Sequence, residues 1–138
     1  MWSHYADGHA GLCLEFQVFR KLGIPLDVTY ADEFPIVNFL TDSDRKQMEA
    51  NLLTKAARWS SECEWRIINT DDGFGLRSFA PEILTGIIFG CRMPQADRDL
   101  VRQWVAAGPA RPEFYEAIAR ADTFDLDVVP LAASESVG

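Results

Sequence analysis

The sequence lacks the features that mark secreted, membrane-spanning or disulfide-bonded proteins. No apolar stretch approaches the roughly 20 residues that a membrane-spanning helix needs. The N-terminus has neither the basic start nor the apolar block of a secretory signal. Three cysteines, Cys13, Cys63 and Cys91, form no CxxC pair, and reduced, buried thiols are the simplest interpretation. These absences predict a cytoplasmic protein that does not bind membranes.

Positive charge is also scarce. The 13 Lys and Arg residues stand against 21 Asp and Glu residues, which gives a net charge of -8. This charge disfavours a general affinity for nucleic acid. Apolar residues are plentiful, at 48% of 138 residues. The composition therefore predicts one globular domain over residues 1–131, followed by a polar tail, residues 132–138, that we expect to be disordered.

Apolar periodicity predicts a sheet with two principal amphipathic helices. One helix begins near Thr41 and has apolar spacing that reaches Trp59, and the other lies between Pro94 and Gly108. Several adjacent strands have connections too short for a crossover helix. The expected fold class is therefore α+β, with a mainly antiparallel or mixed sheet. Strands are expected at residues 11–19, 26–30, 62–68, 75–79, 83–91, 114–121 and 123–131.

The stretch RWSSECEWRIIN, residues 58–69, carries the most chemistry. In a strand, side chains alternate between two faces, so Glu62, Glu64 and Arg66 would share one face, with Trp65 packing into the core on the other. Arg66 can hold one carboxylate ionised while the other binds a ligand hydroxyl or stabilises a developing cation. A solvated row of charges is the alternative interpretation. Both interpretations stay open at this point.

A second group of candidate residues lies at the N-terminus: His4, Tyr5 and His9. A histidine exchanges a proton near neutral pH, and a tyrosine stacks on heteroaromatic rings. Packing within the fold is the alternative for His4 and Tyr5, and His9 with Gly11 can simply shape a turn. The spacing of the histidines and Cys13 matches no zinc pattern, so no metal site is expected. Because so little precedes these residues, we hypothesise that an N-terminal portion is missing.

Two motifs make the sequence resemble a known family. MWSHYADGHAGLCLEF, residues 1–16, carries W-x-x-Y-A and H-x-G before an apolar strand, and residues 55–66 fit K-x-x-x-W-x-x-E-x-E-W-R. Both resemble the bacterial family described as domain of unknown function twenty-nine seventy-one, and the resemblance extends to the strand at residues 86–93 and the last two strands. Relatives usually carry a preceding segment, which this chain lacks. Some are labelled as abortive-infection or phage-defence proteins, which implies a role in phage defence.

A more remote similarity is to ADP-ribosyltransferases. It implies that Tyr5 clasps nicotinamide while Glu64 bonds the ribose hydroxyl and stabilises an oxocarbenium-like transition state. We therefore expect a domain that binds a nucleotide ligand resembling NAD or transfers ADP-ribose. The alternative is a non-catalytic sensing or protein-interaction module, with a small-molecule or protein partner. The assigned roles are catalysis by Glu64, Tyr5 and His4, and ligand binding by Glu62, Arg66 and His9.

Overall fold

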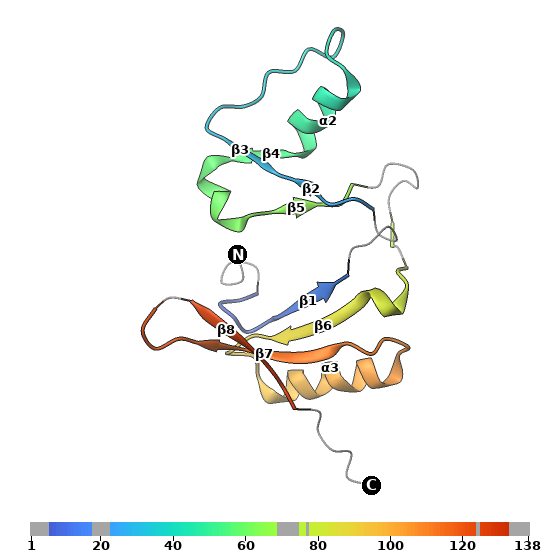
Figure 1. Cartoon of the computed structure of the whole chain (residues 1–138), viewed down its shortest axis with the longest axis vertical. Coiled ribbons are helices and arrows are strands. Elements are labelled where there is room, and N and C mark those ends of the chain that lie inside the picture. The colour runs from blue at the N-terminus through green and yellow to red at the C-terminus, as the bar shows by residue number, and fades with distance from the viewer. Residues whose placement is uncertain (1–5, 18–22, 69–74, 77, 124, 133–138) are drawn as a thin grey trace. The chain divides into compact units, whose positions relative to one another are not determined.

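The fold class is α+β, as predicted. The computed structural model describes residues 6–17, 23–68, 75–76, 78–123 and 125–132. The chain divides into two compact units (Figure 1). Unit 1 comprises residues 1–17 and 78–138, and unit 2 comprises residues 18–77. One globular domain over residues 1–131 stays a prediction, and the predicted tail lies outside the described residues except for Ala132.

Unit 1 is built on a four-stranded mixed sheet in the order β1-β6-β7-β8. Strand β6 is antiparallel to β1 and parallel to β7, and β7 is antiparallel to β8. This arrangement confirms a mixed sheet, with the apolar run of β6 as a central strand. The strands are β1 (Leu12–Phe16), β6 (Leu84–Phe89), β7 (Glu113–Ala119) and β8 (Leu126–Pro130), and the short 3-10 helix η2 (Pro81–Ile83) precedes β6.

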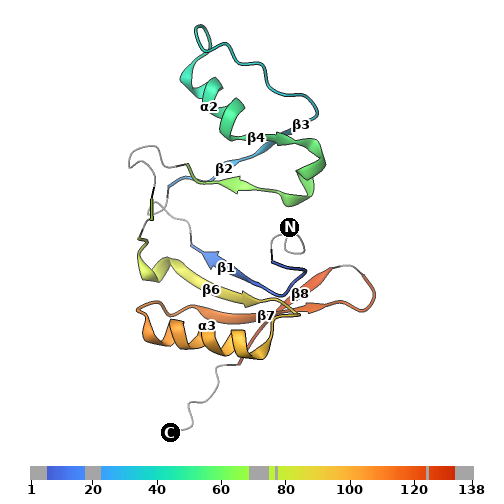
Figure 2. The same ribbon diagram turned by 180° about the vertical axis from the view of Figure 1, so that it is seen from behind.

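Helix α3 (Gln95–Ala107) makes the crossover between the parallel strands β6 and β7. Figures 1 and 2 show it lying along one face of the sheet. Ile87 and Phe89 alternate onto one face of β6 and form a buried cluster with Val101 of the helix. The hydrophobic core of unit 1 therefore lies between the sheet and α3.

The turn before β1 packs closely against the end of β6. The Gly90 N–H donates to the Gly11 carbonyl at 2.9 Å, and the Arg92 N–H donates to the His9 carbonyl at 3.1 Å. A Cβ on Gly90 would lie 2.0 Å from the His9 carbonyl oxygen, and one on Gly11 would lie 2.9 Å from the Ala6 Cβ. Glycine at both positions is therefore needed for this contact. The H-x-G motif therefore serves to shape the turn that packs against the end of β6.

Unit 2 contains two small sheets of two strands each. Strand β2 (Leu26–Asp27) pairs antiparallel with β5 (Trp65–Arg66), and β3 (Thr29–Ala31) pairs parallel with β4 (Thr54–Ala56). The expected strand at residues 26–30 is thus divided between the two sheets. The division falls at Val28, which is buried.

Helix α2 (Asp44–Leu52) begins near the predicted position. Its N-cap is Ser43, whose Oγ accepts a hydrogen bond from the Lys46 N–H at 3.3 Å. The helix ends at Leu52, well before Trp59, so the apolar spacing that continued past Leu52 was not helical. No residue of α2 is buried, so this helix does not cover a sheet with an apolar face.

Three further predictions were wrong. The strand expected at residues 62–68 is reduced to β5, because the 3-10 helix η1 (Ala57–Glu62) occupies its start and Cys63 turns the chain with a φ of 46°. Residues 75–76 and 78–79, the described part of another expected strand, contain none. The thiols of Cys13 and Cys63, expected to be buried, are exposed.

The buried part of unit 2 is small. Among its described residues, only Val28, Leu53 and Glu62 are buried, at 3%, 7% and 8% exposure. One of the three is a charged residue. Unit 2 therefore depends less on an apolar core than unit 1 does. In the described part of the chain, no helix has the length and apolar character required to cross a membrane.

Replacing Gly90 tests the close contact between the turn and β6. We expect Gly90→Ala to lower the free energy of unfolding by about 1–3 kcal/mol, because the new Cβ must push the turn away. Gly108→Ala is the control: its Cβ would lie 3.5 Å from the Trp104 carbonyl oxygen, an ordinary contact distance, so its effect should stay within about 0.5 kcal/mol. Urea unfolding followed by circular dichroism measures both. Equal stability of the two variants would contradict the contact.

Candidate functional site

Four charged side chains meet in unit 2, and we call them the charged cluster: Lys55, Glu62, Glu64 and Arg66. Lys55 comes from β4, Glu62 ends η1, Glu64 precedes β5, and Arg66 lies in β5. The left-handed conformation of Cys63 allows the chain to turn between the two glutamates. The three charged residues predicted to share a strand face are therefore brought together by a turn instead.

The hydrogen bonds of the charged cluster centre on Glu64. Arg66 donates two hydrogen bonds to the Glu64 carboxylate, from Nε to Oε1 at 2.6 Å and from Nη2 to Oε2 at 3.1 Å. The Lys55 ammonium donates to Glu64 Oε2 at 3.2 Å and also pairs with the Glu62 carboxylate. The third guanidinium nitrogen, Nη1, donates to the Leu52 carbonyl at 2.5 Å. Such charge-assisted, two-pronged bonds are strong and specific in geometry.

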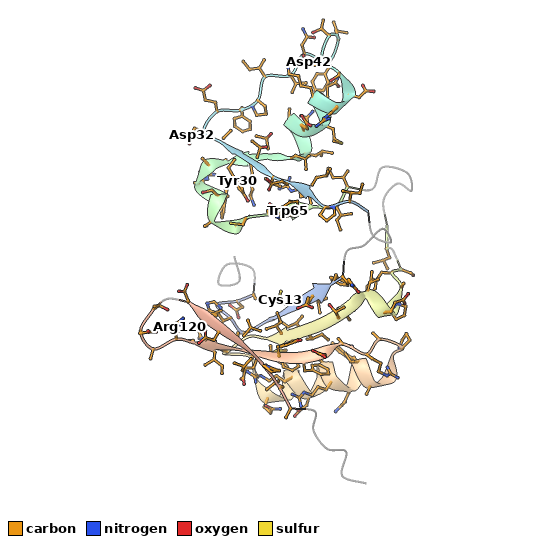
Figure 3. The ribbon with its side chains drawn as sticks, in the orientation of Figure 1. Cys13, Tyr30, Asp32, Asp42, Trp65 and Arg120 are labelled. Atoms are coloured by element: carbon orange, nitrogen blue, oxygen red, sulfur yellow. The ribbon has the colours of Figure 1, made fainter. Side chains whose placement is uncertain are left out.

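The backbone around Glu64 is also fixed. Its N–H donates to the Tyr30 hydroxyl at 2.9 Å, and its carbonyl accepts the Val28 N–H at 3.1 Å. The Lys55 ammonium lies 5.3 Å from the centroid of the Trp59 ring, within cation–π range. Figure 3 labels Tyr30 and Trp65 in this region. Trp65, predicted to pack in the core, is 63% exposed.

The electrostatics of the charged cluster keep Glu64 ionised. Hydrogen bonds from Arg66, and secondarily from Lys55, hold the pKa of the Glu64 carboxyl below its ordinary value, against a smaller opposing effect of burial. The bond to Glu62 raises the pKa of Lys55, and the bond to Glu64 raises the pKa of Arg66. Glu64 is therefore a carboxylate at neutral pH and cannot act there as a general acid.

A groove adjoins the charged cluster in unit 2. Its volume is about 230 Å³, and Lys55 belongs to both the groove and the cluster. Asp32, Glu33 and Phe34 also line it. The remaining lining residues come from the loop after β3, the end of α2 and strand β4: Ala31, Pro35, Ala50, Asn51, Thr54 and Ala56.

Of the predicted N-terminal residues, His9 is the one that lies in the described part of the chain. His4 and Tyr5 lie outside the described residues. His9 belongs to unit 1, where its backbone carbonyl accepts the Arg92 N–H and its φ is 73°. The turn-shaping interpretation of His9 thus has a described basis, whereas its role in ligand binding stays a prediction.

Two residues of the site were missed from the sequence. Lys55 had a usable signal, because it is the first residue of the K-x-x-x-W-x-x-E-x-E-W-R motif. Tyr30 had no such signal in the sequence, since it ends an ordinary apolar strand pattern. Its hydroxyl contacts Glu64 because the fold brings the two residues together. Within residues 6–17, 23–68 and the other described segments, no three His, Cys, Asp or Glu side chains are arranged to hold a metal ion.

The charged cluster predicts how stability depends on pH. We expect Glu64→Gln to lower the free energy of unfolding by about 1–3 kcal/mol near pH 7, because Arg66 and Lys55 lose a charged acceptor. The contribution of a carboxylate with a lowered pKa is present above its unfolded pKa of about 4.3 and is lost as pH falls through the folded pKa. The difference between wild type and variant should therefore shrink below about pH 4.

Glu49→Gln serves as the matched control for that measurement. Glu49 accepts a hydrogen bond from Arg45 at 2.7 Å, but both side chains are largely exposed. Its loss should change stability by no more than about 0.5 kcal/mol. Urea unfolding at pH 7 and pH 3.5 compares the variants. A Glu64→Gln effect as small as the control, or one that is unchanged in acid, would refute the assigned role of the cluster.

The motifs predicted a family, and comparison with known proteins tests that prediction. The family described as Protein of unknown function (DUF2971) has a model that matches residues 1–67. This segment contains both motifs and the whole charged cluster, and it stops short of the strand at residues 86–93. No curated protein and no solved structure matches the chain. The resemblance is confirmed over this segment: residues 1–67 of the chain match the model of the family Protein of unknown function (DUF2971).

Proposed function

We propose that unit 2 is a protein-interaction module that binds a partner segment with basic and apolar side chains. The observation that carries the proposal is the loop of residues 34–40, which we call the apolar loop. Its four largest side chains are exposed: Phe34 97%, Ile36 90%, Phe39 69% and Leu40 95%. Contiguous exposed apolar surface of this kind typically marks an interaction site.

The C-terminal part of the apolar loop is held in a defined conformation. The Asn38 N–H donates to Asp42 Oδ2 at 2.8 Å, and the Asn38 Oδ1 accepts the Leu40 N–H at 3.0 Å. Two backbone bonds, from Thr41 and Asp42 to the Asn38 carbonyl, close the same turn. A preformed loop loses less conformational entropy on binding than a mobile one. The arrangement therefore favours presentation of the apolar side chains to a partner.

Charge identifies the chemistry of the partner. Residues 32–44 contain Asp32, Glu33, Asp42 and Asp44 but no Lys or Arg. Figure 3 shows Asp32 and Asp42 at the two ends of the loop between β3 and α2. Asp42 already pairs with Lys46 at 2.8 Å, so the negative charge that remains for a partner is that of Asp32 and Glu33. These carboxylates beside the apolar loop complement a partner that is apolar and basic, such as an amphipathic helix with Lys and Arg.

The groove beside Phe34 fits the same partner. A volume of about 230 Å³ is below the 300–1,000 Å³ typical of pockets for whole small molecules. It is suited to one long side chain of a partner, with Asp32 and Glu33 to receive its positive charge. The charged cluster adjoins the groove through Lys55, which belongs to both.

A synthetic amphipathic helix of leucine and lysine tests this proposal. Fluorescence anisotropy of the labelled peptide should report binding to the full chain, and binding should weaken as salt rises. The double substitution Phe34→Ser and Leu40→Ser should weaken binding at least about tenfold, because each exposed side chain loses its contact with the peptide. Circular dichroism should show that the fold is retained, since both side chains are almost fully exposed.

Two controls make that result specific. Ile24→Ser removes a 78% exposed apolar side chain outside the apolar loop and should leave binding unchanged. A scrambled peptide of the same composition should bind more weakly, because it presents no apolar face. Equal binding of both peptides, or equal binding by the double variant and wild type, would overturn the proposal.

Nucleotide-ligand binding or ADP-ribose transfer is the second candidate, and one observation favours it. A carboxylate offers about four acceptor positions, and among the described residues three donors reach Glu64: one at Oε1 and two at Oε2. Glu64 thus keeps an acceptor position on an ionised carboxylate, as a bond to a ribose hydroxyl requires. The resemblance to abortive-infection relatives adds the proposal that the protein acts in the cytoplasm in phage defence.

Calorimetry with NAD distinguishes this second candidate. If it is correct, the full chain should bind or consume NAD, and Glu64→Gln should weaken binding or slow turnover at least about tenfold through loss of the ionised acceptor. The measurement belongs at a temperature where circular dichroism shows both proteins folded, with Glu49→Gln as control. Absence of both binding and turnover in the wild-type chain would reject NAD as the ligand.

A further inference from the structure

Arg102 of α3 is a partly buried cation whose Nε has no hydrogen-bond partner in the described part of the chain. Its guanidinium lies 5.6 Å from the centroid of the Phe89 ring and 5.4 Å from that of Phe114, and these two rings stack on each other. The Nε atom itself is buried. Cation–π contacts do not satisfy an N–H donor, so an acceptor is missing.

Arg98, one helical turn earlier, shows what a satisfied arginine looks like on the same helix. Its Nη1 pairs with Glu116 Oε1 at 2.6 Å, its Nη2 donates to the Gly90 carbonyl at 3.0 Å, and its Nε donates to the Met93 carbonyl at 3.1 Å. Nothing comparable reaches Arg102 among the described residues. A buried N–H without an acceptor is costly to a fold, so the Arg102 guanidinium is left as a donor for an acceptor from outside the chain.

Arg102 lines a groove of unit 1 that has room for such an acceptor. The groove has a volume of about 630 Å³, within the range of sites that bind whole small molecules. Most of its other lining residues are apolar, and they come from α3, β7 and the end of β8: Ala106, Pro112, Phe114, Pro130 and Leu131. One cation within an apolar lining fits a ligand with one anionic end and an apolar body.

Glu113 limits the charge of that ligand. It also lines the groove, and its Oε2 accepts a hydrogen bond from the Tyr115 hydroxyl at 2.5 Å instead of pairing with Arg102. The negative charge of Glu113, on a chain of net charge -8, repels phosphates and other multiply charged anions. We propose that the groove binds a small monocarboxylate, with its carboxylate on Arg102 and an apolar ring or chain against Phe114 and Leu131.

Benzoate is the probe for this site, and two-dimensional NMR of the full chain is the measurement. Benzoate should shift the amide signals of α3 and of the start of β7 in a saturable way. Benzyl alcohol, which keeps the ring without the charge, should bind at least about tenfold more weakly, because it lacks the charge-assisted hydrogen bonds. Inorganic phosphate should bind no better than benzyl alcohol.

Variants separate the role of Arg102 from a general effect of charge. Arg102→Met should weaken benzoate binding at least about tenfold, whereas Arg45→Met, which removes the same charge from an exposed site in unit 2, should not. Ala106→Phe fills the groove one helical turn from Arg102 and should also prevent binding. Circular dichroism should show all three folded. Unchanged benzoate binding by both Arg102→Met and Ala106→Phe, or no saturable shifts in wild type, would overturn the proposal.

Discussion

The hydrogen bonds of Lys55 and Arg66 to the carboxylates of Glu62 and Glu64 are the interaction on which unit 2 depends. They join β4, η1 and β5 in a unit whose described residues include only two buried apolar side chains. A core of that size contributes little of the free energy needed to order a chain segment. Removing one member leaves a charge without its partner in a partly buried place, so single substitutions there should have large effects.

The two units use their apolar residues in opposite ways. Unit 1 buries Ile87 and Phe89 against α3 and makes an ordinary core. Unit 2 leaves the apolar loop exposed, holds its C-terminal end with hydrogen bonds, and has the carboxylates of Asp32 and Glu33 directly before it in the chain. Polar interactions that stabilise the unit and apolar side chains that remain exposed are both expected of a surface that binds a partner. For this reason the interaction module is supported better than catalysis.

The sequence predicted the elements that have a long apolar pattern or several boundary signals, such as proline and glycine. The apolar, β-branched run that forms β6 was predicted as a central strand. The apolar stripe between Pro94 and Gly108 was predicted as a helix, and both elements are present. The segment at residues 62–68 was predicted wrongly, because six residues that alternate in polarity look the same whether Cys63 continues a strand or turns left-handed. Glu62, Glu64 and Arg66 of the charged cluster were nevertheless identified, since a turn and a strand can both bring glutamates near Arg66, whereas Lys55 was missed. Contacts made only by the fold, such as Tyr30 to Glu64 and Arg102 to its groove, left no trace in the sequence.

Amide hydrogen exchange in a Lys55→Met variant tests most directly whether the charged cluster holds unit 2 together. The Val28 and Thr29 amides report on unit 2, because they donate to the Glu64 and Leu53 carbonyls, and the Gly90 amide reports on unit 1. The account predicts that exchange at Val28 and Thr29 accelerates at least about tenfold while exchange at Gly90 stays the same. Unchanged exchange at Val28 and Thr29, or an equal acceleration in both units, would contradict it.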